Sequence, residues 1–225
     1  MIDRIQVVDD GVHDGIVNMR RDTYLLDLDG VRARVYQWDR DWVSLGMFQT
    51  PETALVEGCQ TPWVMRPTGG KAVLHGHDLT LGMSAPLALI GTDSRGVKTA
   101  YRWLAEPIIS ALNEVGIPAT LAERTPFVRG AGKVADCFAH VAANDIVHPG
   151  TGQKVCGCAL RLTHDAVLLQ ASIPLGKPLV DPAEVFDVPA LVSMDRSVTR
   201  IDFAAALRES LTEWVAQHGD RTILA

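Results

Sequence analysis

Apolar and polar residues alternate with a period of two along several short stretches of the chain, which is the pattern of half-buried strands. The clearest example is "VRARVYQWD", and the run "WVSLGMFQ" follows it closely. Farther along, a Gly-Gly pair and the turn "HGHD" interrupt similar runs. We expect strands over residues 31–39, 42–49 and 119–124, two strands within 62–86, and three within 143–175 with turns at "HPGTGQ" and "THDA".

Other stretches space their apolar residues about 3.6 positions apart, as helices with one buried face do. The long stretch that ends at Gly116 is the clearest, and a C-terminal one can start at Asp202 and end at Gly219. We expect helices over residues 17–29, 53–58 (opened by Thr53), 97–117, 181–189 and 197–219. Because the strands arrive mostly as hairpins, the order predicts an α+β fold in which helices pack against one main, mixed and largely antiparallel sheet. No stretch marks a domain boundary, so a single domain over residues 1–225 is expected.

Composition restricts the class of protein. The chain has 225 residues, of which 47% are hydrophobic, enough for one large domain with its own core. No apolar run reaches the roughly 20 residues that span a bilayer, and the N-terminus is acidic where a signal peptide is basic, so we expect a cytoplasmic protein without a membrane partner. A net charge of −6 argues against a nucleic-acid partner, because nucleic acids are themselves negatively charged.

Four cysteines, at positions 59, 137, 156 and 158, are expected to stay reduced in that compartment. Cys156 and Cys158 are too close together for a Cys-x-x-Cys motif, and in a strand they point to the same face. No second Cys or His pair has the spacing of zinc ligands, so no metal site is expected.

The stretch "WVMRPTGGKAVLHGHDLTLGMSAP" gathers the most polar chemistry. Gly69 and Gly70 let a ligand lie against the main chain, and Arg66 and Lys71 beside them can neutralise a carboxylate or phosphate. An ordinary hairpin turn with solvated charges explains the same residues. The later "PGTGQK" is not a phosphate-binding loop, because Gln153 separates the glycine from the lysine and a strand, not a helix, follows.

Three separated motifs occur together in register: "WVSLGMFQ", then "RPTGGKAVLHGHDLT", then "NDIV" followed by "QKVCGCALR". In order and spacing, from about residue 38 to residue 175, they resemble the lipoate-protein ligase and octanoyltransferase family, which is related to the biotin protein ligases. The resemblance implies the biotin/lipoate protein ligase catalytic-domain fold.

The resemblance also implies roles for residues that match the family's motifs. Arg66, Thr68, Gly69 and Gly70 look like the loop along the acyl chain and its carbonyl end, and His75 looks like the motif histidine. Lys154 resembles the active-site lysine that points at the acyl carbonyl. The family's Gly-Ser-Ala reads Gly157-Cys158-Ala159 here, so Gly157 and Ala159 are expected at the substrate while a thiol replaces the hydroxyl.

Within that family the chain most resembles the cysteine-dependent octanoyltransferases of Gram-positive bacteria. Lys71 stands where many ligases have a third glycine, Cys137-Phe138 matches the transferases' nucleophile motif, and the chain ends soon after one helix, so the ligases' C-terminal accessory domain is expected to be absent. The resemblance implies that an octanoyl or lipoyl group passes through Cys137 to a lysine of a lipoyl domain, with no cofactor. The implied donor is octanoyl-acyl carrier protein, and the implied acceptor is a glycine cleavage H protein or a dehydrogenase E2.

Two alternatives stay open. The first is a lipoate-protein ligase that uses ATP and Mg and forms a lipoyl-adenylate. The second is a non-catalytic binding scaffold of the same fold, supported by the change at Cys158.

A nucleophilic thiol needs a nearby cation or base, because a free thiol with a pKa of about 8.5 is mostly protonated at neutral pH. Lys154, Lys71 and His75 are the candidates. Cys137 can instead be a small buried residue, in which case Cys158 is the next candidate nucleophile. Three further expectations concern the surroundings: Val73, Leu81 and Met83 as apolar walls for the acyl chain, Asn144-Asp145 as a turn or a positioning pair, and Arg66, Lys71, Arg129 and Lys133 as a basic surface for acidic carriers.

Overall fold

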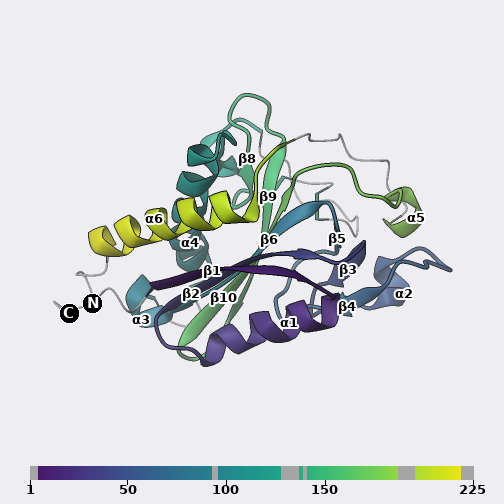
Figure 1. Cartoon of the computed structure of the whole chain (residues 1–225), viewed down its shortest axis with the longest axis horizontal. Helices are drawn as coiled ribbons and strands as arrows, with labels where there is room; N and C mark the ends of the chain where they lie inside the picture. Colours follow the sequence, from purple (N-terminus) through teal and green to yellow (C-terminus); the bar gives the residue numbers. More distant parts are fainter. Residues whose placement is uncertain (1–4, 93–95, 128–136, 139–140, 187–195, 219–225) are drawn as a thin grey trace.

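The computed structural model describes residues 5–92, 96–127, 137–138, 141–186 and 196–218. A seven-stranded sheet forms its centre (Figure 1). The strand order across this sheet is β1 (Ile5–His13), β2 (Val31–Trp38), β6 (Asp78–Pro86), β10 (Ala166–Pro174), β9 (Lys154–Leu162), β8 (Ile146–Val147) and β7 (Thr120–Leu121). Only β1 and β2 pair in parallel in this sheet, so the predicted mixed, largely antiparallel sheet is confirmed.

A second sheet of three strands was not predicted. Its order is β4 (Trp63–Met65), β3 (Trp42–Leu45) and β5 (Val73–His75). Two strands were expected within 62–86, and the structure has three. Gly70 and Gly76 have φ angles of +86° and +114°, which end the extended conformation before and after β5. A glycine is also needed after β3: a Cβ on Gly46 would lie 2.0 Å from the carbonyl oxygen of Gly70.

The helices cover both faces of the main sheet (Figure 1). Their bounds are α1 (Gly15–Tyr24), α2 (Pro51–Ala54), α3 (Leu87–Ile90), α4 (Val97–Glu114), α5 (Ala183–Phe186) and α6 (Arg200–His218), with 3-10 turns at η2 (Leu25–Asp27) and η3 (Ala122–Arg124). Helices α4 and α6 pack together, with Trp103 edge-on to Trp214 at 6.2 Å, over one face, and α1 lies against the other. No helix in the described part of the chain is long and apolar enough to cross a membrane.

The boundaries differ from the predicted ones for identifiable reasons. Helix α1 starts two residues early because the side chain of Asp14 caps it, accepting from the backbone N–H of Val17 at 2.8 Å. Helix α6 starts at Arg200, where the Thr199 hydroxyl donates to Asp202 Oδ2 and accepts from the backbone N–H of Asp202. Gly219, the expected end of this helix, lies outside the described residues. Two expectations were wrong: α2 begins at Pro51, not Thr53, and the strand over 119–124 keeps two residues before the 3-10 turn.

The two faces of the main sheet have different chemistry. Toward α4 and α6 the strands β2, β6 and β10 present apolar side chains, including Val35, Leu81 and Met83. Toward α1 the same strands present buried polar residues, among them Arg34, Thr80 and Gln170. Because a buried polar face needs internal hydrogen-bond partners, this second face is where a specific site is expected.

Candidate active site

Lys154, the first residue of β9, contacts Cys137 from a segment 17 residues upstream. Its Nζ lies 3.3 Å from the sulfur of Cys137 and 2.9 Å from the carbonyl oxygen of that residue. The third ammonium proton goes to Asp145, whose Oδ1 is 3.0 Å away. The side chain of Lys154 is 5% exposed, and within the described part of the chain its ammonium lies against these partners and 5.3 Å from the centre of the Phe138 ring.

The surroundings of Lys154 favour its charged form. Burial alone disfavours an ammonium, but the neighbouring Cys137 thiol and the Asp145 carboxylate outweigh it and hold the pKa of Lys154 above its ordinary value. Asp145 also ends the preceding turn, because its Oδ2 accepts from the backbone N–H of Ala142 at 2.7 Å. The sequence left Asp145 open between a turn and a positioning role, and the structure gives it contacts of both kinds.

Two backbone features bring Cys137 to this place. Its N–H donates to the carbonyl oxygen of Ala72, 2.9 Å away, directly before β5. On the other side lies Gly157, where a Cβ would come within 3.5 Å of the Cys137 sulfur and 3.2 Å of Lys154 Cε. A glycine at position 157 thus leaves room for the Cys137–Lys154 contact, and its main chain borders the same space.

Cys137 lines a cavity on the α1 side of the sheet. Apolar walls come from α1, β2, β5, β9 and β10, and polar side chains come from β3, β5, β6, β10 and the loop after β4. Lining residues include Met19, Tyr36, Trp38, Val73, Cys158, Ala159 and Ala171 on the apolar side and Ser44, Arg66, His75, Thr80, Gln170 and Ser172 on the polar side. Gly70 and Gly157 line it as well, so six of the ten predicted site residues line this cavity: Arg66, Gly70, His75, Cys137, Gly157 and Ala159.

Arg66 shapes the loop beside this cavity. Its guanidinium donates five hydrogen bonds, to the carbonyl oxygens of Gly69, Lys71 and Ser44 and to the Ser44 hydroxyl. Burial lowers the pKa of Arg66, which is 5% exposed. All five N–H groups are therefore committed to the protein, and the expectation that Arg66 belongs to a basic docking surface was wrong.

His75 is fixed at both ring nitrogens and has no recorded contact with Cys137. Nδ1 is 2.8 Å from Asp78 Oδ2, Nε2 is 2.8 Å from Ser44 Oγ, and the ring stacks on Trp38 with centroids 4.1 Å apart. Asp78 is fully buried, which alone would raise its pKa, but His75 and hydroxyl donors lower that pKa to about 2. Of the three candidate partners for the thiol, the structure joins only Lys154 to it among the described contacts.

The other predicted residues fall into three groups. Thr68 is buried, and its hydroxyl donates to Gln170 Oε1 at 2.6 Å, whereas the carbonyl oxygens of Gly69 and Lys71 accept from Arg66. Leu81 and Met83 pack in the core under α4 and α6, so the expectation that they form walls for an acyl chain was wrong. Val73, in contrast, lines the cavity. Arg129 and Lys133 lie outside the described residues.

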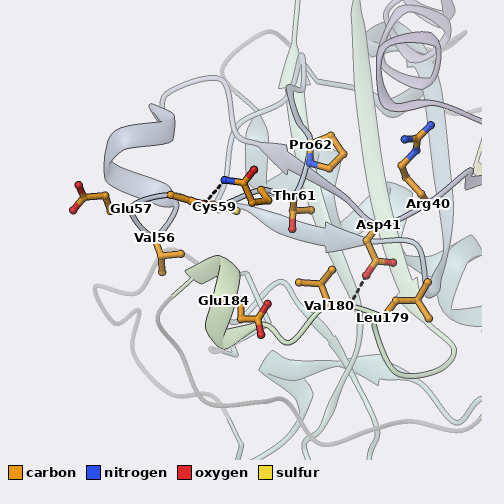
Figure 2. Close-up of a pocket in the computed structure, with 12 residues that line it drawn as sticks. Arg40, Asp41, Val56, Glu57, Cys59, Thr61, Pro62, Leu179, Val180 and Glu184 are labelled. Atoms are coloured by element: carbon orange, nitrogen blue, oxygen red, sulfur yellow. Dashed lines mark hydrogen bonds between the residues drawn. The ribbon is translucent and has the colours of Figure 1, made fainter.

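Two of the remaining cysteines lie on the same strand as Lys154, and one of them, Cys158, lines the same cavity as Cys137. Cys156 and Cys158 do share a face of β9, with their sulfurs 3.8 Å apart, and the hydrogen bond from Cys158 and burial raise the pKa of Cys156. Cys59 lines a different pocket, against α2 and α5 (Figure 2). There the Asp41 carboxylate accepts from the backbone N–H of Val180 at 2.7 Å, and none of the predicted site residues takes part.

Several residues of the site were not predicted from the sequence. The polar side of the cavity includes hydrogen bonds between Ser44 and His75 and between Gln170 and Asp22. The last two residues are 148 positions apart in the chain. For Ser44 and Gln170 the signal was a polar residue in an otherwise apolar strand, which also fits a solvated face; Asp22 lies on helix α1 and had no such signal. Among the described residues there is no cluster of three or more His, Cys, Asp or Glu side chains that could hold a metal ion.

Comparisons with known proteins match most of the chain. The family model described as the lipoyl protein ligase A/B catalytic domain matches residues 14–222. Octanoyltransferase LipM of Exiguobacterium sp. is 30% identical over 194 residues, which are 81% of this chain and 68% of that protein. Octanoyltransferase LipM of Clostridioides difficile is 27% identical over 208 residues, 86% of this chain and 70% of the relative.

The fold has solved counterparts. The structure of protein Ta0514 from T. acidophilum with bound lipoic acid matches with a TM-score of 0.70 at 18% identity, covering 95% of this chain and 86% of the other. At that identity the likeness concerns the fold alone, and it confirms the expected catalytic-domain architecture. The match of the family model over most of the chain, together with the relatives at about 30% identity, shows that this chain belongs to the lipoyl protein ligase A/B catalytic-domain family.

Proposed function

We propose that this chain is an acyltransferase that moves an octanoyl group from a carrier protein to a lysine of a lipoyl domain through a thioester on Cys137. The observation that carries the proposal is the contact of 3.3 Å between Lys154 Nζ and the Cys137 sulfur beside the cavity that Cys137 lines. The relatives named octanoyltransferase support the reaction class.

In the first step the Cys137 thiolate attacks the carbonyl carbon of the carrier's thioester. A C–S bond forms and the carbonyl π pair moves onto oxygen; collapse of that oxyanion expels the carrier's thiolate, which takes up a proton. A thiolate exchanges thioesters at little thermodynamic cost, which suits a cysteine to this step. The buried Lys154 ammonium, whose pKa is raised, stabilises first the thiolate and then the oxyanion.

In the second step the neutral amine of the acceptor lysine attacks the Cys137 thioester. The new C–N bond replaces the C–S bond, the amine loses a proton, and Cys137 leaves as a thiolate beside Lys154. Since an amide is more stable than a thioester, this half-reaction runs toward the acylated lipoyl domain. The chain's own residues supply the covalent route, so it uses no ATP.

A lipoate-protein ligase is the alternative within the same family. Its adenylate intermediate has no covalent bond to the protein, so it has no use for a cysteine held against a buried lysine. A non-catalytic scaffold has no need of this pair either, because burying an ammonium costs free energy that only specific partners offset.

A donor assay separates these functions. A lipoyl domain is incubated with the protein and either octanoyl-acyl carrier protein or octanoate with ATP and Mg, and its mass is measured. We expect an octanoyl increment with the carrier alone. Acylation that requires ATP and Mg would establish the ligase, and no acylation from either donor would favour the scaffold.

A further inference from the structure

The Lys154 ammonium has a second partner besides Cys137, the carboxylate of Asp145, whose Oδ1 lies 3.0 Å from Nζ. The proposed reaction gives steps to Lys154 and Cys137 but none to this carboxylate. We infer that Asp145 is a positioning residue: it fixes the ammonium beside Cys137 and balances its charge, and so sets how readily the Cys137 thiolate forms. The inference rests on the proposed function and deepens it, because it concerns the same thiol.

Asp145 is anchored to the main chain of two segments. Its Oδ2 accepts from the backbone N–H of Ala142 at 2.7 Å, and its own N–H donates to the carbonyl oxygen of Ala142 at 3.1 Å. Its carbonyl oxygen accepts from the N–H of Ala122, in the turn η3, at 2.8 Å. The other carboxylate oxygen, Oδ1, faces Lys154, and the side chain is 8% exposed. The carboxylate is therefore a fixed point against which the ammonium is held.

The long side chain of Lys154 needs such a fixed point, because holding a flexible stem in one rotamer costs conformational entropy. Its other two recorded acceptors, at 2.9 and 3.3 Å, are the carbonyl oxygen and the sulfur of Cys137. The sulfur has no negative charge while it carries an acyl group, whereas the reaction leaves the carboxylate unchanged. Asp145 thus compensates Lys154 in the acyl-enzyme, where a buried ammonium without an anion would be costly.

The same carboxylate limits how strongly Lys154 favours the thiolate. Lys154 and Asp145 are neutral as a pair, so a thiolate at Cys137 adds a net negative charge to a buried site. With a neutral amide in place of the carboxylate, the thiolate would instead neutralise an unpaired ammonium, and it would form at a lower pH. A thiolate that forms at a lower pH is a weaker nucleophile, so the carboxylate favours attack on the donor thioester.

Other titratable groups also surround Cys137. Arg66, from the loop after β4, and Tyr101 of α4 interact with it electrostatically, and His75 and Cys158 line the same cavity. Replacing the carboxylate at position 145 leaves all of these groups in the protein. A difference in thiolate formation between the wild type and such a variant therefore reports the carboxylate.

Alkylation by iodoacetamide tests the inference without an acyl donor, because the thiolate, and not the thiol, displaces iodide. Peptide mass spectrometry separates Cys137 from the other cysteines. We expect the pH midpoint of Cys137 alkylation to fall by about one unit or more in Asp145→Asn. Asp165→Asn, which removes an exposed carboxylate at the β9–β10 turn, should keep the wild-type midpoint. A midpoint that stays or rises in Asp145→Asn would overturn the inference, because a carboxylate that only supports the fold predicts no fall.

Asp145→Glu separates position from charge, since it keeps the carboxylate and moves it by one methylene. We expect this variant to keep the alkylation midpoint of the wild type but to be acylated by octanoyl-acyl carrier protein at least tenfold more slowly, because small misplacements of a reacting site cost rate. Acylation at the wild-type rate would overturn the positioning role.

Circular dichroism establishes that each variant is folded. If Asp145→Asn does not fold, Asp145→Ser takes its place, because its hydroxyl can still accept from Ala142, and the same fall in the midpoint is expected. If octanoyl-acyl carrier protein acylates not even the wild type, the proposed function fails. The alkylation midpoints then still decide the role of Asp145: a fall supports it, and no fall overturns it.

Discussion

At the scale of single residues, Lys154 is a buried cation with three defined partners. One of them is the carboxylate of Asp145, whose Oδ1 lies 3.0 Å from Nζ. The ammonium therefore has a compensating charge in the resting protein and remains available when negative charge develops on sulfur or on the acyl oxygen. This makes Lys154 the residue whose removal should affect rate most for the smallest change in structure.

We predict that Lys154→Ala slows octanoyl transfer by a hundredfold or more, because one preorganised donor to an oxyanion is typically worth about 3–4 kcal/mol. The measurement is single-turnover transfer, with circular dichroism to confirm folding. Lys177→Ala, which removes an exposed lysine, is the matched control. A folded Lys154→Ala protein that turns over like the wild type would remove Lys154 from the mechanism.

Gly157→Ala tests the geometry without removing a functional group. The added methyl would lie 3.2 Å from Lys154 Cε and 3.3 Å from Phe138 Cζ, tighter than ordinary contact, so the Cys137–Lys154 pair has to shift. We expect the rate of acylation to fall at least tenfold, since misplacement by about 1 Å can cost a hundredfold. Gly176→Ala, with open space around it, should keep full activity, and equal rates for the two variants would contradict this account.

At the scale of elements, Asp78 ties together β5, β6 and β10 from the start of β6. The contacts to His75, Thr80 and Ser172 link the small sheet to the main one, so the carboxylate is part of the stability of the fold as well as of the site. Its ionised form is the one that accepts all three.

This contact predicts an acid-dependent loss of stability. The pKa of Asp78 falls from an ordinary 3.8 to about 2 in the folded protein, so its stabilising contribution is present above pH 4 and is lost as the pH drops toward 2. The shift corresponds to about 2 kcal/mol. Urea unfolding from pH 6 down to pH 2 should show this difference between the wild type and Asp78→Asn. A difference that stays constant over that range would contradict the assignment.

The elements also show how far the sequence carries. Alternation predicted β2 and β10, because one face of each packs apolar side chains into the core, and it also predicted β9, although Lys154 and Arg161 interrupt its two faces. Helical spacing predicted α4 and α6. Strand β1 was not predicted, because Asp9, Asp10 and Gly11 break its alternation at a bulge before Val12. The resemblance named Cys137 and Lys154, which the structure places in contact, but nothing local indicated Asp22, whose hydrogen-bond partners Arg34, Tyr36 and Gln170 lie on the two strands β2 and β10.

At the scale of the whole molecule, the two sheet faces divide the work. The face under α4 and α6 is an apolar core that supplies stability, and α1 lies against the other face (Figure 1). That other face carries the cavity, whose Gln170 and Ser172 side chains hydrogen-bond to the buried carboxylates of Asp22 and Asp78. The thiol and the ammonium come from segments that the fold brings together beside that cavity. The proposed function thus depends on one covalent event, the formation of a thioester on the sulfur of Cys137.

The mass of the intact protein after incubation with octanoyl-acyl carrier protein, without ATP or acceptor, tests that event most directly. We predict an octanoyl adduct on Cys137 that neutral hydroxylamine removes, as it removes thioesters. Cys158→Ser should still form this adduct, and its loss in that variant would make Cys158 the nucleophile instead. Cys137→Ser should form no hydroxylamine-sensitive adduct and should lose transfer to the lipoyl domain. A Cys137→Ser protein that still acylates the lipoyl domain would contradict the account.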